Sequence, residues 1–85
     1  MTFDESIIEE ITDILKMLIE EEDLSSKIKI AITKVYSKIT PELDEEDLLK
    51  IQDELENIST MNNLNDFCRT ELMNLITSIE AAVNS

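Results

Sequence analysis

The sequence predicts an all-α protein, an antiparallel four-helix bundle built from two tandem helical hairpins within one domain that spans residues 1–85. Two observations carry this prediction. Apolar residues recur at helical spacing along the chain. The apolar pattern also repeats after about 40 residues, at eleven pairs that run from Phe3 with Leu43 to Ile39 with Ile79. A unit of two helices cannot bury its apolar stripe alone, so two units are expected to pack together.

The first hairpin covers about residues 4–39. Its first helix is expected over 4–22, on the apolar positions Ile7, Ile8, Ile11, Ile14, Leu15, Leu18 and Ile19. The acidic run 20–23 should end this helix, because anions are unfavourable at the negative end of a helix dipole. Ser25 or Ser26 then caps a second helix. Its buried stripe is Ile28, Ala31, Ile32, Val35, Tyr36 and Ile39.

The second hairpin covers about residues 43–83. Pro41 stops the preceding helix, and the third helix begins either at Asp44 or at Thr40 with Pro41 in its first turn. This helix runs to about Ser59 on the stripe Leu48, Ile51, Leu55 and Ile58. A polar loop follows at 60–63, and Asn65 caps the last helix as a serine caps the second. The last stripe is Cys68, Leu72, Leu75, Ile76, Ile79 and Val83.

The charge balance is strongly acidic, with 7 basic and 20 acidic residues and a formal net charge of −13. The chain has no histidine, tryptophan or glycine, and its single cysteine cannot form an internal disulfide. We therefore expect a reducing, cytoplasmic location. No apolar run approaches the length of a membrane span, and the first ten residues carry acid where a signal peptide needs base. These features predict a protein that does not enter a membrane.

Three short stretches carry a family resemblance: Asp-Leu-Ser-Ser-Lys-Ile-Lys-Ile-Ala at 23–31, Leu-Glu-Asn-Ile-Ser at 55–59, and Arg69 with Thr70. With them the chain resembles a small archaeal family, uncharacterised protein family 0147, over nearly its whole length. The family carries prolines at both caps, where this chain has Ser25 and Asn65. The resemblance implies a compact four-helix fold from an archaeon, and it implies no activity.

The residues for catalysis and metal binding are largely missing. The acidic runs 20–23 and 44–47 could attract a divalent cation, but consecutive helical residues point in different directions. A di-iron carboxylate bundle needs histidine, which the chain lacks. Cys68 falls on a buried stripe, where an inert packing role is expected. We predict no enzyme, no cofactor and no metal site, and a metal-dependent enzyme is the least favoured alternative.

Four of the seven cations lie in the second helix, and Lys27, Lys34 and Lys38 share one of its faces. One interpretation is a basic stripe for nucleic acid. The other is that these lysines pair with the acidic helices beside them, which the net charge favours. Direct binding of nucleic acid is therefore not expected.

Five apolar residues lie away from the buried stripes and have no apolar counterpart in the other hairpin: Met17, Ile30, Leu49, Phe67 and Met73. We interpret them as candidates for contact with a protein partner or for homodimer formation. The hypothesis for function is a non-catalytic protein–protein interaction module or small accessory subunit. The alternative is an acidic decoy that occupies the nucleic-acid-binding surface of a basic partner.

Overall fold

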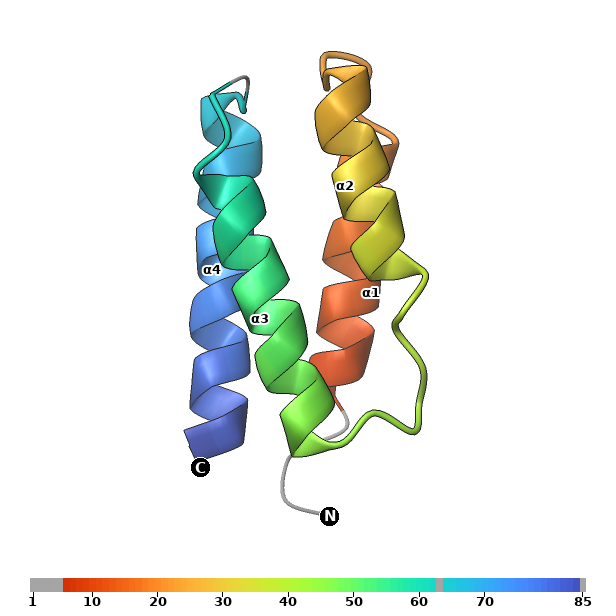
Figure 1. Cartoon of the computed structure of the whole chain (residues 1–85), viewed down its shortest axis with the longest axis vertical. Coiled ribbons are helices and arrows are strands. Elements are labelled where there is room, and N and C mark those ends of the chain that lie inside the picture. Colours follow the sequence, from red (N-terminus) through yellow and green to blue (C-terminus); the bar gives the residue numbers. More distant parts are fainter. Residues whose placement is uncertain (1–5, 63, 85) are drawn as a thin grey trace.

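A computed structural model describes residues 6–62 and 64–84 of the chain. Its four helices are α1 (Ser6–Ile19), α2 (Ser26–Tyr36), α3 (Glu45–Ser59) and α4 (Asp66–Asn84). Consecutive helices run in opposite directions, and the hairpins α1–α2 and α3–α4 stand side by side (Figure 1). Between the hairpins, α1 packs against α4 and α2 packs against α3. The predicted antiparallel four-helix bundle is confirmed.

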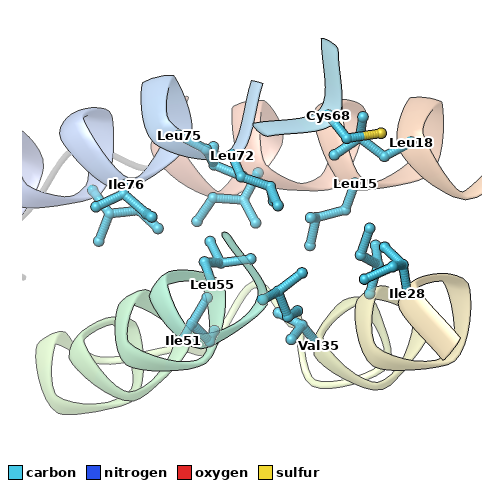
Figure 2. Packing of buried hydrophobic residues seen from close by; sticks show 14 of the residues in the cluster. Leu15, Leu18, Ile28, Val35, Ile51, Leu55, Cys68, Leu72, Leu75 and Ile76 are labelled. Carbon is cyan, nitrogen blue, oxygen red and sulfur yellow. The ribbon is translucent and has the colours of Figure 1, made fainter. Parts of the chain in front are cut away.

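The interior of the bundle is apolar, and within the described ranges no polar or charged residue is buried. Side chains from all four helices meet there, as Figure 2 shows for Leu15, Val35, Leu55 and Leu72. Several residues of the predicted stripes lie at the margin, partly buried against this core: Ile8, Ile14, Ile19, Ala31, Tyr36, Ile39 and Val83. The bundle therefore buries the predicted helical faces, and burial decreases from the centre of each face to its margin.

The pattern of burial repeats between the two hairpins. Residues 11–35 and 51–75 agree, position by position, in being buried, partly buried or exposed wherever both positions are described. The agreement ends at the outer turns, where Ile7 is buried and Asp47 is only partly buried. The two hairpins thus present equivalent faces to the core, as the period of the apolar residues predicts.

Two helix ends fall short of the predicted limits. α1 ends at Ile19 instead of residue 22, and the backbone N–H of Glu21 donates to the Leu18 oxygen at 3.1 Å, three residues back. α2 ends at Tyr36 instead of residue 39, and Ile39 donates to Tyr36 at 3.1 Å in the same way. In both places the chain leaves the helix through tighter turns, before the acidic run and before Pro41. Residues 4 and 5 of the predicted first helix lie outside the described residues.

The helix starts follow the predicted caps. The Ser25 hydroxyl accepts a hydrogen bond from the Ile28 N–H at 3.3 Å, and the Asn65 side-chain oxygen accepts one from the Cys68 N–H at 2.8 Å. α3 begins after Asp44, whose carboxylate accepts from the Asp47 N–H at 2.8 Å while Asp47 accepts from the Asp44 N–H. This reciprocal capping box decides between the two predicted starts in favour of Asp44.

Candidate binding groove

Three hollows follow the seam between α2 and α3. The first, of about 340 Å³, lies between the start of α2 and the loop after α3. The second, of about 390 Å³, lies midway along the seam, and the third, of about 410 Å³, lies at the end where α2 stops and α3 begins. Met61 lines the first and second hollows, and Glu54 lines the second and third. Neighbouring hollows thus share a lining residue, and we call the three together the α2/α3 groove.

The floor of the α2/α3 groove is apolar. Val35, Ile51 and Ile58 are buried beneath it. Ala31, Leu43 and Met61 are partly buried and form the part of the floor that a ligand could touch. Ala31 comes from α2, whereas Leu43 and Met61 come from the loops that flank α3. Apolar contact is therefore offered at both ends and in the middle of the groove.

The rim of the groove concentrates positive charge. Lys27, Lys34, Lys38 and Lys50 line it, together with the two carboxylates of Asp47 and Glu54. The lining therefore has a net charge of +2, whereas the rest of the chain has 18 acidic and 3 basic residues and a net charge of −15. The groove is a locally basic site on an acidic protein.

One ion pair crosses the groove, from the Lys38 ammonium on the α2 side to the Glu54 carboxylate on α3. Both side chains remain solvated, with exposed fractions of 54% and 35%. The predicted pairing of the second helix with an acidic neighbour is thus observed for Lys38. No ion pair is described for Lys27 or Lys34 within residues 6–62 and 64–84, so their charge is available to a ligand.

All five candidate contact residues are exposed, with exposed fractions for Met17 of 39%, Ile30 of 61%, Leu49 of 43%, Phe67 of 46% and Met73 of 50%. They are spread over the four helices and do not line the three hollows. Leu49 lies near the start of α3 and Phe67 near the start of α4, which are opposite ends of an antiparallel pair (Figure 1). The structure does not gather the five into one patch.

Ile30 is the member of this set that lies beside the groove. It follows Lys27 by three residues and precedes Lys34 by four, so the three side chains are neighbours on the surface of α2. Ile30 is also the most exposed of the five. It adds an apolar side chain to the outer wall of the groove.

Sequence reasoning did not identify Leu43 and Met61 as floor residues. Both lie in connections between helices, where helical spacing gives no signal, and Met61 stands in a predicted polar loop. The alignment of the two hairpins does contain a signal for Met61, because this residue is the counterpart of Glu21. An apolar residue on one loop where the other loop has a carboxylate marks a difference in surface chemistry.

Cys68 is fully buried among the core side chains, as its place on the apolar stripe predicts (Figure 2). Burial raises the pKa of its thiol, and the charges of Glu21 and Glu71 raise it further against the opposing hydrogen bond from Asn65. A thiol held in its protonated form inside a core is a poor nucleophile.

Among the described residues, no group of three or more histidine, cysteine, aspartate or glutamate side chains is placed to hold a metal ion. Within the same residues, none of the helices has both the length and the apolar character that crossing a bilayer requires.

No family model, curated protein or solved structure matches the chain. The resemblance to uncharacterised protein family 0147 therefore stays a prediction.

Proposed function

We propose that the protein is a non-catalytic protein-interaction module that binds its partner in the α2/α3 groove. The observation that carries this proposal is the succession of three hollows along one seam, with partly buried apolar side chains on the floor and charge on the rim. Recognition surfaces combine an apolar centre with a polar margin in this way. The lining includes neither histidine nor cysteine, so it offers no familiar nucleophile–base pair.

The five exposed apolar residues enter this proposal in two ways. Ile30 stands beside the groove and is expected to extend the contact surface. Met17, Leu49, Phe67 and Met73 are spread over α1, α3 and α4, and a homodimer or second partner through them requires a contact away from the groove. Variants at these positions therefore serve as controls for the groove.

The test is affinity capture from native cell extract with wild-type protein and with Ala31→Glu. A glutamate side chain at this position fills the middle of the groove, and the fold should accept it because the counterpart of Ala31 in α4 is the partly buried Glu71. We expect a discrete partner to bind wild-type protein and to be lost with Ala31→Glu, at unchanged helicity by circular dichroism.

Leu49→Gln and Phe67→Gln are the matched controls, since both residues are exposed and neither lines the groove. Both variants should retain the partner. If Ala31→Glu retains every partner while Phe67→Gln loses one, binding lies outside the groove and the proposed site is wrong.

The acidic decoy is the second candidate, and the distribution of charge favours it as a separate activity. With four lysines collected at the groove, the remaining surface carries the net charge of −15. A basic partner would bind this surface, would survive Ala31→Glu, and would be released by salt as nucleic-acid complexes are. Capture at low and high salt separates the two candidates.

A further inference from the structure

We propose that the occupant of the α2/α3 groove is an acidic amphipathic helix of another protein, an inference that rests on the proposed function and names the chemistry of its partner. Three properties of the groove lead to it: its charge, its shape, and the position of its apolar floor between lysines.

The charge of the groove selects against basic partners. Lys27 and Lys34 are exposed and have no ion-pair partner within the described residues, and Lys50 stands on the α3 side. Carboxylates on a bound segment would meet these ammonium groups on both walls. Charge complementarity of this kind guides encounter and disfavours wrong partners.

The shape of the groove suits a helix. From Lys27 to Lys34 the α2 wall rises by seven residues, or about 10 Å, and Lys38 lies just beyond the end of the helix. The other common peptide-binding modes need features that are missing here. No strand edge is available in the described residues, and the lining of the hollows includes no aromatic residue for a polyproline segment. A helix that binds between two antiparallel helices contacts such a groove through apolar residues that are three and four positions apart.

The floor residues are spread along the groove. Met61 lies at one end of the groove, Ala31 in the middle and Leu43 at the other end, so a bound helix of about three turns can place one apolar residue against each. Glutamates on the edge of that apolar stripe that faces α2 then meet Lys27 and Lys34, and a glutamate on the other edge can meet Lys50. The partner is therefore apolar along one face and acidic chiefly along the edge that faces α2.

A second copy of the chain and a nucleic acid fit the groove less well. A symmetric dimer through the groove would oppose the lysines of one copy to those of the other. A nucleic acid has no apolar face to place against Ala31, Leu43 and Met61 on the floor.

The experiment measures the binding of synthetic fluorescent peptides by anisotropy. The probe is a helix-favouring peptide of about 14 residues with leucines on one face and glutamates beside them. Matched peptides replace every glutamate by glutamine or by lysine, and a scrambled glutamate peptide keeps the composition without the apolar face. We expect the glutamate peptide to bind about tenfold more tightly than the glutamine peptide, and the lysine peptide to bind most weakly.

Two substitutions in the first turn of α2 provide the matched variants. Lys27→Glu places a carboxylate on the groove, whereas Lys29→Glu makes the same charge change at a side chain that does not line it. A carboxylate at either position lies in the first turn of α2, where the helix dipole favours negative charge, so neither variant should unfold the helix. Lys27→Glu should lower the affinity for the glutamate peptide about tenfold and raise the affinity for the lysine peptide. Lys29→Glu should change neither affinity by more than about twofold.

Several outcomes would overturn the inference. Equal or tighter binding of the glutamine or lysine peptide would show that the groove selects another helix, and equal binding of the scrambled peptide would show charge attraction without a site. Displacement of the peptide by a single-stranded DNA oligonucleotide would favour a nucleic-acid site. Failure of every amphipathic peptide to bind also overturns it, whereas the proposed function falls only if Ala31→Glu retains every captured partner.

Discussion

The two hairpins are alike inside and different outside. Residues 11–35 and 51–75 have the same sequence of buried, partly buried and exposed positions, and each hairpin caps its second helix with a side-chain oxygen. On the surface three groove lysines lie in α2 or just after it, Lys27, Lys34 and Lys38, and they correspond to Phe67, Asn74 and Ser78 of α4.

This difference shows which residues the fold requires. An equivalent face forms in α4 without lysines, so the charge of the groove is not needed to build the helix or to bury its apolar stripe. The fold fixes the apolar positions and the caps, and it leaves the flanks free to carry a binding surface.

The largest effect is expected when a buried side chain is shortened at equivalent positions of the two hairpins. Leu15 and Leu55 are counterparts, and both side chains are fully buried. Leu15→Ala and Leu55→Ala should each lower the free energy of unfolding by about 2–5 kcal/mol, through lost burial and the cavity left behind. Urea denaturation followed by circular dichroism measures the loss.

Each variant should unfold in a single transition, because both leucines belong to one core shared by the hairpins. A second transition in either variant would show that the hairpins unfold separately. A loss at one position several times larger than at the other would show that their equivalence is only superficial.

The caps provide a test of intermediate size. Ser25→Ala and Asn65→Ala each remove the side-chain oxygen that accepts from the first turn of α2 or α4. Each should cost about 1 kcal/mol of stability. The cost should be larger for Asn65, whose hydrogen bond is 2.8 Å long against 3.3 Å for Ser25. The reverse order in thermal or urea unfolding would mean that cap geometry does not decide the difference.

The sequence predicted the interior more fully than the surface, and the reason is physical. Burial imposes a period on the chain, so Ile11, Leu15 and Leu18 could be assigned to one face from spacing alone. A cap has a chemical signature, which is why Ser25 and Asn65 were recognised. The helix ends were overestimated by three residues at Ile19 and at Tyr36, because the tighter turns there preserve helical spacing for a few residues more.

The groove could not be predicted in the same way. The lysine face of the second helix was identified from the sequence. The spacing within that helix could not show that α3 from the other hairpin packs beside it and forms the second wall. Met61 and Leu43 come from loops, which have no period to read. The exposure of Met17, Ile30 and Phe67 followed from their angular positions, whereas their separation on the surface required the arrangement of the helices.

A smaller effect is expected from the ion pair across the groove. Lys38 pairs with Glu54, whereas their counterparts Ser78 and Ile14 cannot form an ion pair. A double-mutant cycle with Lys38→Ala and Glu54→Ala should give a coupling energy below about 1 kcal/mol that falls as salt is added, since both side chains are solvated. A large coupling that salt does not change would mean that the pair is a structural link between the hairpins. The groove would then be more rigid than two solvated side chains imply.

The smallest expected difference lies between Cys68 and its counterpart Ile28, and it depends on pH. Burial, with Glu21 and Glu71, raises the pKa of the Cys68 thiol above the value near 8.5 of an unfolded chain. The folded state therefore holds this proton more tightly than the unfolded state. Its contribution to stability is complete below about pH 8.5 and is lost as the pH rises toward the folded pKa.

Cys68→Ala removes this titration and changes no other ionisable side chain, so the comparison isolates the thiol. The difference in unfolding free energy between wild type and Cys68→Ala should be constant from pH 6 to about pH 8 and should shift against wild type toward pH 10. Urea denaturation across this range measures it. A constant difference to pH 10 would mean that the thiol ionises as readily in the folded chain as in the unfolded one. In that case α4 would open at Cys68, and the second hairpin would be less tightly packed there than the first is at Ile28.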